Sequence, residues 1–334
     1  MARLQEFTLH RPETIEEAVR QLAAEPDARV IAGGTALLAN LRLGLGNPAS
    51  LVSLERIAGI NRIEVSAQSM RIGAGVTVAR LAADSTVRAH LPALAEAALT
   101  VAGPSHRSAA TLGGNLCLDT RCVYYNQSEV WRRSNDYCLK HGGEICHVAP
   151  QGKRCHAAYS GDLAPVLLVM QAGIAVAGAD GLLHMPLADL YHEDGAHHLT
   201  LASGEFVSEV SVPLPAPGLR AAYRKARVRG AIDFPLAGVA MALRMSEGRV
   251  AELRVALTGT NSQPMLLTGT SELLGAPADE AFADKVGKLV QRQASPQRTT
   301  VTTSHYRRQV ATALARRLVL ELSAAGPGRA AGTA

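Results

Sequence analysis

Apolar residues along this chain fall into short runs with strand or helix spacing, and glycine turns separate them. Residues 14–17 have the pattern of a capping box, which predicts a helix over residues 15–25. Gly33-Gly34 lies between an apolar run and a leucine-rich stretch with helical spacing, and so predicts strand, turn and helix. The same reasoning predicts two strands and a helix over residues 62–84, a strong helix over 91–103, and regular structure from 161 to 181.

Residues 117–160, which we call the cysteine segment, interrupt this pattern. Apolar periodicity is absent, and Gly, Lys, Arg, His and Asn are frequent. A segment of this length without regular structure needs another organiser, or it would be disordered. We therefore expect a metal centre with aromatic packing in this region.

The composition changes after a proline-rich stretch at residues 213–217, which we interpret as a linker. Strands followed by helices predict a separate α+β domain beyond it. The strands are expected over 220–229, 234–246 and 249–259, and the helices near 268–275, 279–293 and 305–323. The tail, residues 324–334, is predicted to be disordered.

Bulk properties narrow the class of protein. The chain has 334 residues, 47% of them hydrophobic and 19% charged, and a net charge of +5. Its basic residues form no long runs, so we expect no nucleic-acid partner. No apolar stretch is long and uncharged enough to cross a bilayer, and the N-terminus lacks the apolar core of a signal peptide. We therefore expect no membrane partner, a cytoplasmic location and reduced thiols.

Two glycine turns are candidate phosphate sites. The first is the run from Ala32 to Leu37 (AGGTAL), and the second runs from Thr111 to Asn115 (TLGGN). Glycines let backbone N–H groups approach a phosphate, and each turn has a hydroxyl residue beside it. Two such turns could hold a pyrophosphate from two sides, although two unrelated turns would give the same spacing. We expect no helix directly after the second turn.

All five cysteines fall within the cysteine segment, at positions 117, 122, 138, 146 and 155, so four, fifteen, seven and eight residues separate them. Clustered thiolates are typical of zinc sites and iron–sulfur clusters. Structural zinc sites use closely paired ligands, and here Cys117 and Cys122 alone approach that spacing. Widely spaced single cysteines favour a cubane cluster, with zinc or no metal as the alternatives.

The runs AGGTALL, IGAGVTVARL, AGPSHRSAATLGGN and GDLAP resemble, in order and separation, the flavin-binding medium subunits of the xanthine oxidase family of molybdenum hydroxylases. The resemblance implies an α+β fold with a two-part FAD-binding domain over residues 1–215, split near residue 57. The cysteine segment, 117–160, would be a cluster-binding insert in that domain. A C-terminal α+β domain of antiparallel sheet and helices would follow over residues 216–323.

In that family the two glycine turns hold the FAD pyrophosphate. The resemblance thereby implies cofactor contacts from Ala32, Gly33, Gly34, Thr35, Ala36, Leu37, Thr111, Gly114 and Asn115. Thr77, Asp162 and Lys225 match positions near the flavin. Position 36 is often Asp or Ser in relatives, so a side-chain contact there would be absent while backbone contacts would remain.

Most medium subunits of the family lack residues like 122–158. An insert with four cysteines at this place resembles the 4-hydroxybenzoyl-CoA reductase branch, whose flavin subunits carry a 4Fe-4S cluster there. By this resemblance the ligands are Cys122, Cys138, Cys146 and Cys155. Cys117 would then be no ligand, although it could replace Cys122.

The resemblance implies an electron-transfer subunit that is catalytically incomplete alone. A large molybdopterin subunit and a small 2Fe-2S subunit would be its partners, in a dimer of heterotrimers. Reduced ferredoxin would supply electrons, which pass through the 4Fe-4S cluster and FAD to the partners for reductive dehydroxylation of 4-hydroxybenzoyl-CoA. Cationic residues of the cysteine segment could attract an acidic ferredoxin, although acidic residues lie among them. The alternatives are a medium subunit acting on another aromatic substrate and a zinc-stapled basic binding module without redox activity.

Overall fold

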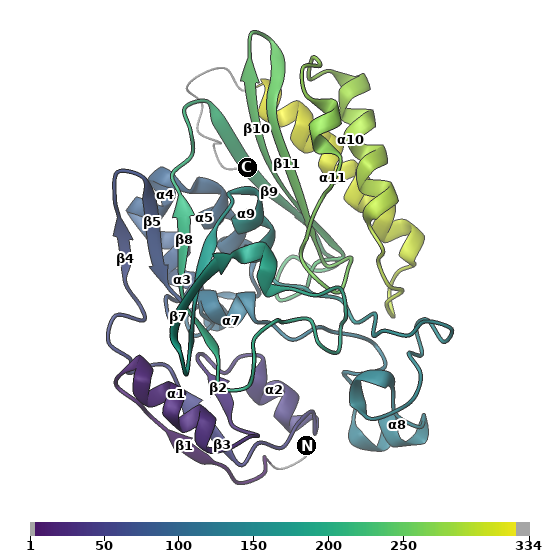
Figure 1. Cartoon of the computed structure of the whole chain (residues 1–334). Helices are drawn as coiled ribbons and strands as arrows, with labels where there is room; N and C mark the ends of the chain where they lie inside the picture. Colours follow the sequence, from purple (N-terminus) through teal and green to yellow (C-terminus); the bar gives the residue numbers. More distant parts are fainter. Residues whose placement is uncertain (1–3, 325–334) are drawn as a thin grey trace.

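The computed structural model describes residues 4–324. The first part of the chain forms a small parallel sheet. Its strand order is β1-β3-β2, and two short helices accompany it (Figure 1). The elements are β1 (Thr8–His10), α1 (Ile15–Ala24), β2 (Arg29–Ile31), α2 (Leu37–Arg42) and β3 (Ser50–Ser53). The capping-box prediction is confirmed at Thr14, whose hydroxyl accepts the backbone N–H of Glu17 at 3.1 Å.

A five-stranded antiparallel sheet with the order β4-β5-β8-β6-β7 forms the centre of the molecule. The strands are β4 (Ile63–Val65), β5 (Ser69–Gly73), β6 (Gly173–Gly178), β7 (Gly181–Pro186) and β8 (Phe206–Pro213). The helices around it are α3 (Val78–Ala83), α4 (Ser85–His90), α5 (Pro92–Thr100), α6 (Pro104–Arg107), α7 (Leu112–Leu116), α9 (Leu163–Val169) and η2 (Leu187–Leu190). Every residue of α9 is buried, so this helix lies inside the core rather than on its surface.

The last third of the chain is a separate layer of antiparallel sheet covered by two long helices (Figure 1). The sheet order is β12-β11-β10-β9, and α10 and α11 pack on it around a second hydrophobic core. The elements are β9 (Leu219–Ala226), β10 (Ala237–Ser246), β11 (Arg249–Thr258), β12 (Met265–Leu266), η3 (Thr270–Leu273), α10 (Glu280–Gln293) and α11 (Ser304–Ala324). The α+β prediction is confirmed; most of the predicted tail, 324–334, lies outside the described residues.

The cysteine segment forms a lobe at the side of the molecule, with α8 (Glu129–Ser134) and η1 (Leu139–His141) in it (Figure 1). Its base is closed by an antiparallel bridge between Arg121 and Ala158, whose backbone groups exchange two hydrogen bonds of 2.8 Å. The segment is therefore a closed loop attached to the body of the molecule.

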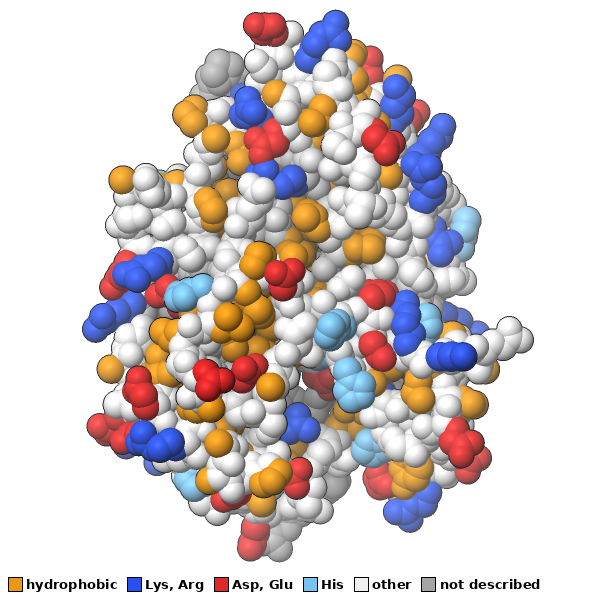
Figure 2. All heavy atoms as spheres, in the orientation of Figure 1, with side chains coloured by type: hydrophobic (Ala, Val, Ile, Leu, Met, Phe, Trp, Pro, Cys, Tyr) orange, Lys and Arg blue, Asp and Glu red, His pale blue; other side chains and the backbone are white. Residues whose placement is uncertain are grey.

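Basic and acidic side chains are interspersed over the face of the molecule drawn in Figure 2. No helix within residues 4–324 combines the length and apolarity needed to cross a bilayer.

Candidate functional site

The two glycine turns lie against each other. A Cβ atom on Gly33 would come within 1.8 Å of the carbonyl oxygen of Ala109, which precedes the second turn by two residues. Such a distance is impossible for any side chain, so glycine is required for the two backbones to approach this closely. The sequence suggested a pair of turns, and the fold brings them together.

The first turn connects β2 to α2 and is open to its surroundings. Gly34 has a φ of +68°, which favours glycine. Thr35 is exposed, and Ala32, Ala36 and Leu37 are partly exposed. Leu38 packs against Gly34 on one side, while Thr35 is exposed, so the free side of this stretch can hold an anionic group.

The second turn is the start of a short helix, which corrects the prediction that no helix follows it. Thr111 is the N-cap of α7, and its hydroxyl accepts the N–H of Gly114 at 3.1 Å. Gly113 packs against Ala74, where a Cβ atom would lie 2.7 Å from the alanine methyl. Two glycines in five residues disfavour a helix, and this close packing overrides their propensity.

Thr77 lies beside the second turn through a backbone bridge to Thr111. Its hydroxyl caps α3 by accepting the N–H of Arg80 at 3.2 Å. Both threonine hydroxyls therefore cap a helix. The backbone bridge between Thr77 and Thr111 keeps the starts of α3 and α7 next to each other.

Asn115 links the second turn to a buried charged pair. Its Oδ1 accepts the N–H of Leu163 at 3.1 Å, next to Asp162. The Asp162 carboxylate accepts a hydrogen bond from Lys225 at 2.9 Å and one from the Tyr223 hydroxyl at 2.6 Å. Burial raises the pKa of Asp162, and the Lys225 ammonium and the Tyr223 hydroxyl oppose that rise. The chain thus brings the flavin-site candidates from both domains into one connected region; the sequence did not point to Tyr223.

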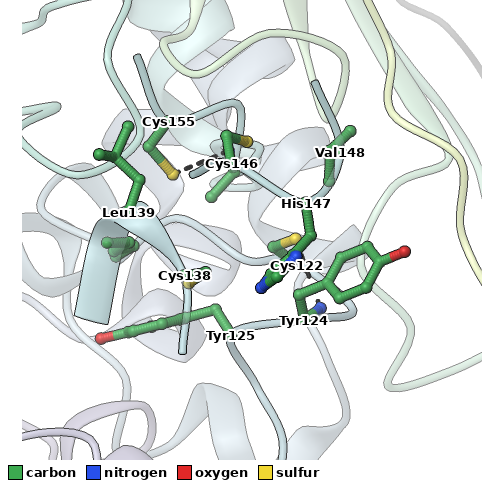
Figure 3. Close-up of a pocket in the computed structure, with 11 residues that line it drawn as sticks. Cys122, Tyr124, Tyr125, Cys138, Leu139, Cys146, His147, Val148 and Cys155 are labelled. Carbon is green, nitrogen blue, oxygen red and sulfur yellow. Dashed lines mark hydrogen bonds between the residues drawn. The ribbon is translucent and has the colours of Figure 1, made fainter. Parts of the chain in front are cut away.

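Four of the five cysteines line one cavity. Figure 3 shows Cys122, Cys138, Cys146 and Cys155 arranged around a shared space, with Tyr124, Tyr125 and Leu139 beside them. The empty space between the lining side chains is about 260 Å³, including the part open to solvent. Within residues 4–324, no three His, Cys, Asp or Glu side chains are grouped tightly enough to hold a single metal ion. The cysteines surround a volume instead of meeting at a point.

Backbone contacts fix the loops that carry these thiols. The N–H of Cys122 donates to Asn126 Oδ1 at 3.0 Å, and the N–H of Cys155 donates to Asp194 Oδ1 at 3.2 Å. Burial raises the pKa of Cys122, and it raises the pKa of Cys155 to about 11, with the nearby charge of Lys140 acting against the rise. Bound metal would have to displace these protons, since thiolates are the metal ligands.

Cys117 does not line the cavity. It is the C-cap of α7 and belongs to the surroundings of the second glycine turn. Burial raises the pKa of its thiol to about 12, which is typical of an inert cysteine.

Two cations of the cysteine segment, Arg132 and Lys140, are buried, so these two do not contribute to the attraction of an acidic ferredoxin that the sequence suggested. The side chain of Arg132 is 1% exposed and that of Lys140 is 6% exposed. Arg132 donates to the carbonyl oxygens of Leu43 at 2.9 Å and Gly44 at 3.1 Å, just after α2. This arginine therefore attaches the cysteine segment to the loop that follows α2.

Comparison with known proteins agrees with this geometry. Residues 5–215 match the FAD binding domain in molybdopterin dehydrogenase, and residues 221–322 match the CO dehydrogenase flavoprotein C-terminal domain. The structure of Cu,Mo-CO dehydrogenase has a chain with the same fold, with a TM-score of 0.80, 24% identity, and coverage of 96% of this chain and 99% of that one.

Two relatives show how much sequence identity this chain shares with other proteins and over what length. The aldehyde oxidoreductase FAD-binding subunit PaoB of Escherichia coli strain K12 is 32% identical over 83% of this chain and 88% of its own length. The carbon monoxide dehydrogenase medium chain of Afipia carboxidovorans is 26% identical over 94% of this chain and 95% of its own. This chain belongs to the family of FAD-binding medium subunits of molybdenum hydroxylases.

Proposed function

We propose that this chain is an electron-transfer subunit that holds FAD at its paired glycine turns and a 4Fe-4S cluster in the cysteine segment. The observation that carries the proposal is the single cavity lined by Cys122, Cys138, Cys146 and Cys155. A cubane has four irons and takes one thiolate each, so its ligands stand around a volume. The zinc-stapled alternative needs four ligand atoms, from cysteine sulfur or histidine nitrogen, around one ion.

The FAD would be held by Ala32, Gly33, Gly34, Thr35, Ala36, Leu37, Thr111, Gly114 and Asn115, with Thr77, Asp162 and Lys225 nearby. The exposed backbone of the first turn suits a pyrophosphate. The Asp162–Lys225 pair offers hydrogen-bonding groups from both domains beside the second turn. When bound, FAD exchanges one or two electrons and an iron–sulfur cluster exchanges one, so together they connect one-electron donors to two-electron chemistry. The residues of this chain position those groups and set their surroundings.

Partner chains would supply the rest of the enzyme. Relatives are named as medium chains or FAD-binding subunits, and the sequence has no cysteine outside residues 117–160 that could hold 2Fe-2S clusters. We therefore propose a large molybdopterin subunit and a small 2Fe-2S subunit as partners, in a dimer of heterotrimers. The free state of all five cysteines is compatible with a reducing cytoplasm.

The proposed reaction of the whole enzyme is that of 4-hydroxybenzoyl-CoA reductase, with reduced ferredoxin as donor. Two electrons and two protons convert 4-hydroxybenzoyl-CoA to benzoyl-CoA and water at the molybdenum site of the large subunit. Support comes from the cysteine segment, which resembles the insert of that enzyme in place and in number of thiols. The 4Fe-4S cluster of this chain, in addition to the 2Fe-2S clusters of the small subunit, would serve as an entry point for low-potential electrons.

A second candidate is the oxidation of an aldehyde. It is favoured by the 32% identity with the aldehyde oxidoreductase subunit of Escherichia coli. In that case electrons would leave the molybdenum subunit through this chain toward an acceptor. The substrate site lies on the partner in either case, so the substrate is decided by assay of the whole enzyme.

The first experiment is anaerobic purification of the full chain, both alone and in complex with its partners, followed by iron, sulfide, zinc and flavin analysis of the chain purified alone. About four iron and four sulfide with one FAD are expected. Cys155→Ser should lose the cluster and keep the flavin, whereas Cys117→Ser should keep both. Zinc without iron would support the zinc-stapled alternative, and loss of iron in Cys117→Ser would overturn the ligand set.

The substrate is tested with the purified complex of this chain and its partners. Reduction of 4-hydroxybenzoyl-CoA by a low-potential donor, with no turnover of aldehydes, would support the reductase. Aldehyde oxidation with no dehydroxylation would replace it by the second candidate.

A further inference from the structure

Lys140 is a buried cation in the wall of the cysteine cavity. It lies in η1, two residues after Cys138, and its side chain is 6% exposed. The other lining residues are the four cysteines, apolar or aromatic side chains, and His147. A lysine is rarely buried without a partner, so its surroundings must hold the charge in place.

Three polar contacts and one ring fix the position of this ammonium. Its Nζ lies 2.5 Å from Asp119 Oδ1 and 2.5 Å from Thr120 Oγ1. It also donates to the carbonyl oxygen of Thr120 at 3.0 Å and lies 4.4 Å from the centre of the Tyr125 ring. These contacts fix the side chain of a residue that lines the cavity and leave it little contact with solvent.

The partner of Lys140 connects the cavity to the flavin side of the molecule. The Asp119 side chain is 34% exposed, and its second carboxylate oxygen accepts a hydrogen bond from Asn40 Nδ2 at 3.3 Å. Asn40 is buried in α2, the helix that follows the Gly33-Gly34 turn. A short polar chain therefore runs from the cavity wall to α2, the helix that follows the first glycine turn.

A charge in this place acts on any group that the four thiols hold. Four thiolates are anionic, and reduction of the group adds a further negative charge. Because Lys140 is buried and the lining around the four thiols is mostly apolar or aromatic, Coulomb interactions are weakly screened, so a fixed cation favours the reduced state. A carboxylate next to the cation opposes it.

We propose that Lys140 raises the reduction potential of the cluster held by the cysteine segment, and that Asp119 limits this rise. The inference rests on the proposed function, because it requires a cluster in the cavity. Lys140 and Asp119 are not ligands, and they have opposite effects on the reduction potential of the cluster at which electrons would enter. Burial and hydrogen bonding are known means by which proteins adjust cluster potentials.

The test is a redox titration of the cluster in the anaerobically purified complex, followed by electron paramagnetic resonance. Lys140→Met should lower the potential, with a change of about tenfold in the reduction equilibrium, which is about 59 mV for a one-electron couple. Asp119→Asn should raise it. Lys153→Met is the matched control, since it removes the same charge from an exposed position of the same segment, and it should leave the potential unchanged.

The outcomes separate the inference from the proposed function. A wild-type subunit without iron would overturn the cluster itself. Full iron content with an equal potential in Lys140→Met and wild type would overturn the role of Lys140 alone. If Lys140→Met loses its iron, Asp119→Asn decides: a raised potential supports the inference, and an unchanged one refutes it.

Discussion

Gly33 and Ala109, which are 76 positions apart in the sequence, are in direct backbone contact. The space for a Cβ atom on Gly33 is already filled by the carbonyl group of Ala109. The first glycine turn therefore sets the position of the second. This contact explains why two turns of unremarkable sequence belong together.

Replacement of Gly33 by alanine should abolish flavin binding. The added methyl would push the two turns apart, with a cost of about 1–3 kcal/mol or more, as in overpacked cores. The flavin absorbance of the purified subunit measures the loss. Gly230→Ala is the control, because a Cβ atom there meets nothing within 4 Å. Equal flavin content in the two variants would contradict the prediction that contact between the two glycine turns is needed for flavin binding.

The stability of the fold should fall in mild acid because of His198. Burial lowers the pKa of this imidazole from 6.5 to about 4. Below pH 6.5 the unfolded chain takes up a proton that the folded chain resists until about pH 4, so stability is lost over this range. The shift corresponds to about 3 kcal/mol at its full extent.

Urea denaturation at pH 7 and pH 4.5 measures this effect. His198→Gln should reduce the difference between the two pH values. His197→Gln is the control, since that residue is exposed. The prediction fails if both variants retain the wild-type pH dependence.

Loss of Lys225 should destabilise the fold more than loss of both members of its ion pair. Lys225 and Asp162 are 2% and 4% exposed. Lys225→Met leaves a buried carboxylate without its cation, which typically costs about 3–5 kcal/mol. The double variant Lys225→Met with Asp162→Asn should recover part of this loss in thermal unfolding. An additive loss would show that packing rather than charge is responsible.

Release of Arg132 should loosen the cysteine segment and spare the flavin. Arg132→Met removes the bonds to Leu43 and Gly44 that hold the segment to the FAD domain. Hydrogen bonds to charged groups contribute about 1.5–3 kcal/mol, so proteolysis within residues 117–160 should accelerate about tenfold or more. Arg133→Met is a neighbouring control, because that side chain is 71% exposed. Equal cleavage of the two variants would refute the anchoring role.

Much of this architecture could be predicted from the sequence, because periodicity and caps are local signals. The helix that begins after Thr14 and the three strands from Leu219 to Thr258 are examples. The helix at residues 112–116 could not be predicted, since it depends on the close packing of Gly113 on Ala74, which spacing does not show. The burial of Arg132 and Lys140 could not be predicted either. Arg132 bonds to the backbone of Leu43, far away in the sequence, and Lys140 bonds to Asp119 on an earlier loop, and residue spacing reveals neither contact.

The closed base of the cysteine segment has a consequence for the history of the chain. Because Arg121 and Ala158 already bond to each other, the residues between them can be gained or excised while the strands and helices on either side keep their places. A flavin subunit could acquire such a module in a single genetic event. Conversely, joining 121 to 158 by a short turn should leave an intact flavoprotein without the cysteine segment.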